Sequence, residues 1–244
     1  MIKSYTGSDI GSGEIKMTVC ANGIIQKAAH IAVPRDLVKG GDIRSEAVMA
    51  VHLRDAGRKH RIKVKDAASA APRGYLFVRR LSVPFMTAEQ LDLNLPYEFR
   101  DYLTGDKNQY FFDYYVVTPP AEGDKTMDIM AAVVRKEVAQ RHARILKRAG
   151  YKLQTFIPEE LAYGNLIRHY AKRHPDEVER DHCIIDLGHD STRVHLFRGD
   201  AFEVTRTIEL GGKDIDAAIA QVLGIDLHEA RTQKHENKDG VQGL

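Results

Sequence analysis

One short pattern occurs twice in this chain, 177 positions apart. Residues 8–20 read SDIGSGEIKMTVC, and residues 183–197 read CIIDLGHDSTRVHLF. A shift of 177 positions, without gaps, places Asp9 on Asp186, Gly11 on Gly188 and Lys16 on Arg193. After each glycine, apolar and polar residues alternate with the period of two that is typical of a β-strand. We therefore predict a duplicated unit of strand, Asp-x-Gly turn and strand, continuing through a tight turn into a third strand.

The glycines of the first turn have two interpretations. The common phosphate-loop patterns GxGxxG and GxxxxGK[ST] are absent, and a strand rather than a helix is expected to follow. Gly11 and Gly13 could supply the positive φ angles of an ordinary hairpin. Alternatively, a glycine- and serine-rich turn points backbone N–H groups inward and forms an anion-binding nest. The second copy favours the nest, because two facing turns can hold a polyphosphate from both sides.

Acidic and basic residues beside the turns suit a phosphate ligand. One carboxylate next to each turn, Asp9 and Asp186, could hold Mg²⁺ through water, since Mg²⁺ keeps much of its hydration shell. Lys16 could reach phosphate oxygens. Hydrolysis would also need a side chain that orients water, and Glu159 and Glu160 are candidates. Both could instead complement the dipole at the start of a helix, and the residues leave this choice open.

Between the two copies, helix and strand patterns alternate as in α/β proteins. Thr87 and Gln90 form a capping-box pattern at the start of a helix in which Pro96 is expected to cause an end or a kink. Gly57 and Gly150 are expected to end the helices before them. The expected helices span residues 44–56, 87–102, 137–149 and 159–172, and the expected strands span residues 75–83, 110–118, 127–134 and 151–157.

Composition excludes several function classes. The 36 Lys and Arg residues nearly balance the 34 Asp and Glu residues, so nothing indicates nucleic-acid binding. No apolar run approaches the roughly 20 residues that span a bilayer, and the N-terminus lacks the apolar core of a secretory signal. Cys20 and Cys183 lie in strand-like runs and are expected to be packed thiols in a reducing compartment. A structural metal is not expected, because HExxH and Cys-His pairings are absent.

Three segments resemble motifs of the actin, hexokinase and Hsp70 superfamily. Residues 9–16 resemble its first phosphate motif, residues 186–192 its second, and residues 157–162 the motif that connects them. Within that superfamily the chain most resembles the PilM family of actin-like type IV pilus assembly proteins. The further similar segments are residues 77–84, 87–102 and 112–117, and residues 208–215 followed by 220–230, which resemble the family's Ile-Gly-Gly-x-x-hydrophobic helix.

The resemblance implies an α/β, actin-like (ribonuclease H-like) fold with two lobes, duplicated β-hairpin phosphate loops and a small inserted subdomain. It also implies that the C-terminal part of that fold is incomplete here. The implied subdomains are IA over residues 1–78 and 153–178, the insert IC over 79–152, IIA over 179–225, and part of IIB over 226–244.

The same resemblance implies ATP with magnesium as ligand, a scaffold role, and at most slow hydrolysis with Glu159 orienting water. It implies that magnesium is held through water by Asp9 and Asp186. The implied partner is the N-terminal cytoplasmic tail of a PilN-type inner-membrane pilus protein, and other pilus assembly components or a second copy of the chain are further candidates. The implied role is in type IV pilus assembly or in the related type II secretion. The chain would then be cytoplasmic and reach the inner face of the membrane through partners. The implied nucleotide-binding residues are Asp9, Gly11, Ser12, Gly13, Lys16, Asp186, Gly188, Ser191, Thr192, Gly211 and Gly212.

Two residues depart from the family pattern. Glu14 stands where a small hydroxyl or amide residue is common, and a carboxylate there is expected to be unfavourable beside a phosphate unless it points away. His189 stands where a small residue is usual and is expected to crowd a phosphate. Two alternative functions belong to the same superfamily. A small-molecule kinase would need a substrate aspartate and a polar cluster in the first lobe, which we do not find. A cell-division protein of the FtsA type would end in an amphipathic membrane helix, and we do not find such a pattern in this sequence.

Overall fold

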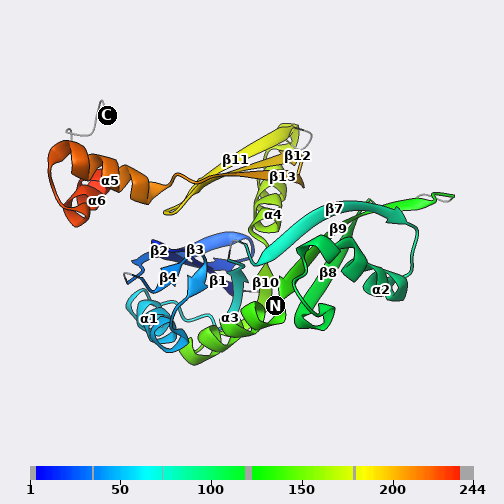
Figure 1. Cartoon of the computed structure of the whole chain (residues 1–244), viewed down its shortest axis with the longest axis horizontal. Helices are drawn as coiled ribbons and strands as arrows, with labels where there is room; N and C mark the ends of the chain where they lie inside the picture. Colours follow the sequence, from blue (N-terminus) through cyan, green and yellow to red (C-terminus); the bar gives the residue numbers. More distant parts are fainter. Residues whose placement is uncertain (1–3, 35, 73, 119–122, 178–179, 237–244) are drawn as a thin grey trace.

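The computed structural model describes residues 4–34, 36–72, 74–118, 123–177 and 180–236. The first lobe is built on a five-stranded sheet of order β10-β6-β1-β2-β3. β1, β2 and β3 form an antiparallel meander, whereas β6 and β10 join the other edge in parallel. The helices α1 and α3 lie together against this sheet (Figure 1). The bounds are β1 Ser4–Ile10, β2 Glu14–Ala21, β3 Ile24–Ala32, β6 Asp66–Ala70, β10 Lys152–Ile157, α1 Glu46–Lys59 and α3 Lys136–Ala149, with a small hairpin of β4 Val38–Lys39 and β5 Asp42–Ile43.

The core of the first lobe follows from the alternation in β2. Ile15 and Met17 are fully buried and pack with Leu53 of α1 and Ile145 of α3. The prediction that Gly57 ends the first helix is wrong, because α1 continues to Lys59. Gly57 is buried inside the helix, where a Cβ would collide with the hydroxyl of Tyr151. A glycine is therefore needed there for close packing and not for termination.

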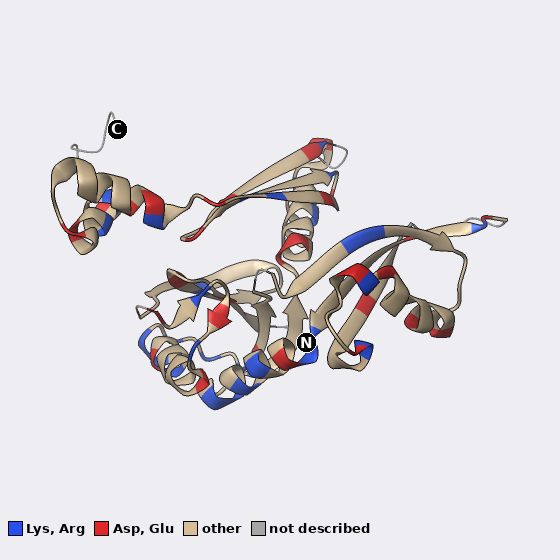
Figure 2. Cartoon of the chain, viewed as in Figure 1, with Lys and Arg blue, Asp and Glu red and all other residues tan. Residues whose placement is uncertain are grey.

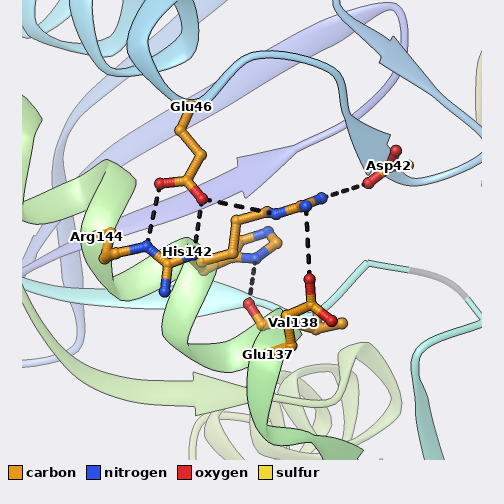
Figure 3. A network of polar contacts seen from close by, with 7 residues as sticks. Asp42, Glu46, Glu137, Val138, His142 and Arg144 are labelled. Carbon is orange, nitrogen blue, oxygen red and sulfur yellow. Dashed lines mark hydrogen bonds and ion pairs between the residues drawn. The ribbon is translucent and has the colours of Figure 1, made fainter.

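Ion pairs join α1 to α3 (Figure 3). Arg144 of α3 pairs with both carboxylate oxygens of Glu46, at 3.1 and 2.7 Å. Arg141 lies 2.6 Å from Asp42 and also contacts Glu46 and Glu137. Figure 2 shows charged positions of both signs along these two helices. The arginine side chains are partly exposed, so we expect each pair to contribute modestly and the network to fix how the helices lie together.

His142 of α3 gives the first lobe a pH dependence. Its side chain is 3% exposed, and burial lowers the pKa, with the charge of Arg141 acting in the same direction. Below pH 6.5 the unfolded chain binds a proton at this position that the folded protein excludes, so stability falls as the pH decreases. We expect His142→Phe to flatten the slope of the free energy of unfolding between pH 5 and 7, by up to about 1.4 kcal/mol per pH unit.

The measurement is urea unfolding at several pH values. His228→Phe, at an exposed position in α6, is the matched control and should leave the slope unchanged. An unchanged slope in His142→Phe would contradict the assignment.

The insert is a three-stranded antiparallel sheet of order β7-β9-β8 with α2 packed against it. Phe99, Leu91 and Leu95 fill its core. The capping box of Thr87 and Gln90 is confirmed, but Pro96 lies within the last turn of α2, which continues to Glu98. The bounds are β7 Leu76–Pro84, α2 Ala88–Glu98, β8 Tyr110–Thr118 and β9 Thr126–Arg135, with 3-10 turns at Arg100–Tyr102 and Lys107–Gln109. α3 falls within the range expected for the insert, yet its buried side chains belong to the core of the first lobe.

The second lobe contains the antiparallel sheet β11-β12-β13, followed by α5 and α6 (Figure 1). α4, which falls within the range expected for the first lobe, packs against this sheet. Phe197 and Phe202 of the sheet form a core with Ile167 of α4 and Met130 of the insert. The bounds are α4 Glu159–Ala171, β11 Asp181–Leu187, β12 Thr192–Arg198, β13 Ala201–Ile208, α5 Gly212–Leu223 and α6 Leu227–Glu236, with a 3-10 turn at Pro175–Glu177.

The two three-stranded meanders match in detail. Asp9 pairs across the ladder with Lys16, and Asp186 pairs with Arg193. The register between the second and third strands shifts between Val19 and Cys20 in the first lobe. It shifts at the equivalent place, between Leu196 and Phe197, in the second lobe. The predicted duplication therefore extends to the strand register and to an irregularity that the sequence alone does not reveal.

The cysteine prediction is only partly right. Cys20 is half-buried and Cys183 is exposed on β11, so Cys183 is not a packed thiol, and neither forms a disulfide. Among the described residues, no helix combines the length and apolar character needed to cross a membrane.

Candidate functional site

The two Asp-x-Gly turns are closed in the same way. The N–H of Gly11 donates to the carbonyl of Glu14 at 3.0 Å, and the N–H of Gly188 donates to the carbonyl of Ser191 at 3.0 Å. A Cβ on Gly11 would lie 2.9 Å from the Glu14 oxygen, and one on Gly188 would lie 2.7 Å from the Ser191 oxygen. The expectation that Gly11 and Gly13 supply positive φ is wrong, because neither has it. Both turns instead need glycine where the chain folds back onto itself.

The turns of the two lobes touch each other. A Cβ on Gly13 would lie 2.8 Å from the Cβ and Cγ atoms of His189. Burial lowers the pKa of His189, and the positive charge of Arg231 adds to this effect. An uncharged imidazole therefore covers the first turn, at the position where a bulky residue was expected to crowd a phosphate. We call the two turns, with the helix starts that contact them, the turn site.

The start of α5 packs directly on the second turn. The N–H groups of Gly212 and Lys213 donate to the carbonyls of Gly188 and His189, at 2.9 and 3.0 Å. The carboxylate of Asp214 accepts from the N–H of Gly211 at 2.8 Å. A Cβ on Gly211 would lie 2.5 to 2.7 Å from backbone atoms of the second turn. These glycines thus join helix and turn at backbone contact distance.

Asp190 connects the second turn to the first turn and to α5. Burial alone would raise the pKa of Asp190, but hydrogen bonding from Ser12 and the charge of Lys213 outweigh it, and the pKa is lowered. Lys213 Nζ lies 3.4 Å from the carboxylate. Asp190 therefore stays ionised and holds Ser12 of the opposite turn.

Each turn carries an acid–base pair on its flanking strands. Lys16 Nζ lies 3.3 Å from Asp9 Oδ2, and both side chains are about half exposed. In the second copy, Arg193 lies 2.5 Å from Asp186 and 2.6 Å from Glu159. These three side chains are only 16–20% exposed. The second copy thus contains a mostly buried guanidinium between two carboxylates.

Glu159 begins α4 beside the second turn. Its second oxygen lies 3.0 Å from Nε2 of the fully buried His195, whose Nδ1 contacts the hydroxyl of Thr205 at 2.8 Å. The ring of Tyr163 lies against His195. Burial strongly raises the pKa of Tyr163, and the negative charges of Asp186, Glu159 and Asp9 add to it. Burial also raises the pKa of the neighbouring Glu160. Aspartates from both copies of the repeated pattern therefore help to keep the phenol of Tyr163 protonated.

α6 reaches the turn site from the C-terminal side. Arg231 donates to the carbonyl of Gly13 at 3.4 Å. Lys234 Nζ lies 2.5 Å from the carboxylate of Asp216, which is buried in α5, and 2.8 Å from the carbonyl of Gly212. α6 thus contacts the first turn and the start of α5.

The structure brings together most of the residues predicted for the site. The turn residues, the two aspartates, Glu159 and the α5 glycines lie in one region. The Thr192 hydroxyl, however, donates to the carbonyl of Leu210 at 2.8 Å. Lys16 contacts Asp9. Arg193 was not among the predicted site residues, and the sequence points to it only because it aligns with Lys16 in the second copy. Sequence reasoning missed the partners that come from distant segments, namely His195, Lys213, Arg231 and Lys234.

These residues fit a phosphate chain better than a bound divalent ion. The backbone N–H groups of Ser12 and Gly13 have no hydrogen-bond partner within the part of the chain that the structure describes, and Lys16 lies on the strand that follows them. Asp9 and Asp186, by contrast, each already contact a protein cation. No three His, Cys, Asp or Glu side chains among the described residues are arranged to hold a metal ion. The donor set therefore favours an anion and does not offer an open magnesium site.

The family model for type IV pilus assembly protein PilM matches residues 7–240. This chain belongs to the PilM family. The expected family and actin-like fold are thus confirmed. A PilM chain solved as a PilM–PilN type IV pilus biogenesis complex superposes with a TM-score of 0.81, at 24% identity over 95% of this chain and 69% of that one.

Other actin-like folds are also similar. The ethanolamine utilization protein EutJ from Carboxydothermus hydrogenoformans gives a TM-score of 0.58 at 17% identity, covering 96% of this chain and 61% of that one. ADP-bound MreB5 of Spiroplasma citri gives 0.51 at 13% identity, covering 95% and 61%. Cell division protein FtsA of Staphylococcus epidermidis is 24% identical over 110 residues, which are 45% of this chain but only 22% of FtsA. The chain therefore aligns with about a fifth of this curated relative.

Proposed function

We propose that this chain is an actin-like scaffold of type IV pilus assembly that binds ATP between its two hairpin turns. The observation that carries the proposal is the matched pair of turns, each closed by the same backbone hydrogen bond and flanked by an aspartate paired with a basic residue. The fold of nucleotide-bound MreB5 supports a nucleotide ligand. Ser12, Gly13 and Lys16 would contact phosphate oxygens, with Gly188, Ser191 and the start of α5 opposite them.

The ligand cannot enter without a local rearrangement. The imidazole of His189 lies over Gly13, so the turns must separate before a phosphate chain passes between them. Glu159, the candidate for orienting water, pairs with Arg193 at one oxygen and lies 3.0 Å from Nε2 of His195 at the other. A role for ATP as a structural ligand, with slow hydrolysis, agrees with these contacts.

The proposed partner is a short cytoplasmic tail of a PilN-type inner-membrane protein. Support comes from the solved PilM–PilN complex, whose PilM chain shares this fold. The cytoplasmic domain of EpsL, an inner-membrane component of type II secretion, gives a TM-score of 0.51 at 14% identity. The chain would then act at the membrane through its partner.

Titration calorimetry with ATP and with the partner's N-terminal tail peptide tests the two parts separately. We expect ATP binding that Lys16→Ala weakens by about 10-fold, because one charge-assisted contact is lost. Lys39→Ala, at an exposed lysine of β4, is the matched control and should bind like the wild type. Absence of binding to ATP would reject the nucleotide part. The partner part requires binding to the tail peptide and none to a scrambled peptide of the same composition.

A further inference from the structure

Arg193 occupies the space between two carboxylates of the turn site. Its Nη1 lies 2.6 Å from Oε2 of Glu159, and its Nη2 lies 2.5 Å from Oδ2 of Asp186. The two ends of one guanidinium therefore bridge a helix start and a hairpin strand. His195 contacts the other oxygen of Glu159 from the buried side and limits its rotation.

The equivalent position in the first lobe lacks this arrangement. Lys16 has a single carboxylate partner, Asp9, and both side chains are about half exposed. In the second lobe, Asp186 and Glu159 are 16% and 18% exposed, so their charges are poorly screened by water. Two such carboxylates at one site need a cation, because each would otherwise be buried without compensation. A divalent ion and a guanidinium can both fill that role.

We infer that Arg193 is the resident cation of the turn site and replaces the divalent metal there, so that a nucleoside polyphosphate binds without Mg²⁺. The inference rests on the proposed function of the site. It follows from the position of the guanidinium between the aspartate that flanks the second turn on β11 and the carboxylate that begins α4. It also agrees with the absence of a metal-type cluster among the described residues.

The first test compares ATP binding by the wild-type chain in EDTA and in excess Mg²⁺. We expect dissociation constants within about twofold of each other. Binding that is tighter with Mg²⁺ by clearly more than about twofold would overturn the inference while leaving the proposed nucleotide function intact. No binding under either condition would instead reject the nucleotide function, and the inference with it.

The second test removes the guanidinium without using a nucleotide. In Arg193→Gln the two carboxylates lose their cation, and we expect 5 mM Mg²⁺ or Mn²⁺ to raise the Tm by roughly 5–10 °C. The same ions should leave the wild type and Arg198→Gln, an exposed position on the same strand, unchanged. The double variant Arg193→Gln/Glu159→Gln should lose most of the effect, because one carboxylate is gone.

The response of Arg193→Gln to metal, compared with that of the wild type, decides this test. A metal-dependent rise confined to Arg193→Gln, or folding of that variant only when metal is present, supports the inference. No metal response in a folded Arg193→Gln, or an equal response in the wild type, overturns it. If Arg193→Gln stays unfolded in both conditions, Arg193→Ala and the comparison of EDTA with Mg²⁺ in the wild type decide the question.

Discussion

Replacement of Gly211 with alanine is expected to lower the free energy of unfolding by about 3 kcal/mol and the Tm by roughly 6–12 °C. The new Cβ would lie 2.5 Å from the His189 carbonyl oxygen and 2.6 Å from the Ser191 nitrogen. These are backbone atoms, so no side-chain rotation relieves the clash. The helix must move away from the turn, and the hydrogen bonds from Gly212 and Lys213 are then lost or lengthened.

Thermal unfolding and ATP titration together measure this change. The matched control is Gly212→Ala, one residue further along, where the nearest atom to a Cβ is the side-chain Nζ of Lys234 at 3.2 Å, which has to shift by only a few tenths of an ångström. We expect that control to be within about 0.5 kcal/mol of the wild type, because alanine is favourable in a helix. Equal stability of the two variants would show that α5 does not pack on the second turn as the structure describes.

The parts of the fold that depend on neighbouring residues were predictable. The Asp-x-Gly turns and the strands on either side of them follow from residue alternation and from glycine spacing, both of which are local. The capping box of Thr87 and the C-terminal Gly150, with φ of 91°, are likewise encoded within a few residues. The pattern occurs twice, and two unrelated hairpins rarely share an acid, a glycine and a basic residue at equal spacing. This repetition is the reason that the two turns could be predicted as a ligand site.

Features that depend on contacts between distant segments were not predictable. Gly57 has the pattern of a helix end, yet the hydroxyl of Tyr151, 94 positions later, explains it. Pro96 removes the backbone hydrogen bond to the carbonyl of Asp92, yet α2 continues past it and ends two residues later, at Glu98. Cys183 is exposed because no other element covers its side chain on β11 among the described residues. The residues around Cys183 in the sequence do not indicate which elements pack on that strand.

The site shows the same division between local and distant information. Lys16 and Arg193 occupy equivalent positions, so the sequence indicates that both lie near a turn. Only the fold shows that α4 places Glu159 against Arg193, whereas Lys16 pairs with Asp9 alone among the described residues. Equivalent residues thus acquire different surroundings, and the first pair stays open to a ligand while the second is enclosed.

Disruption of the ion pair between Lys234 and Asp216 is also expected to lower the free energy of unfolding strongly. Asp216 is 5% exposed in α5, and Lys234 of α6 supplies its cation at 2.5 Å while also donating to the carbonyl of Gly212. Lys234→Met leaves a buried carboxylate without compensation, and we expect a loss of about 3 kcal/mol in urea unfolding. The start of α5 should shift as well, because Gly212 loses one hydrogen bond.

Two further variants separate charge compensation from packing. In Lys234→Met/Asp216→Leu, an apolar pair replaces the ion pair, and most of the lost stability should return because no buried charge remains. Lys213→Met removes the partly exposed partner of Asp190 and should cost less than about 1 kcal/mol. A loss in Lys234→Met that is as small as in Lys213→Met would mean that water screens Asp216 after all. The position of α6 would then depend on apolar packing and on the contact of Arg231 with the first turn, so α6 would move when a ligand separates the turns.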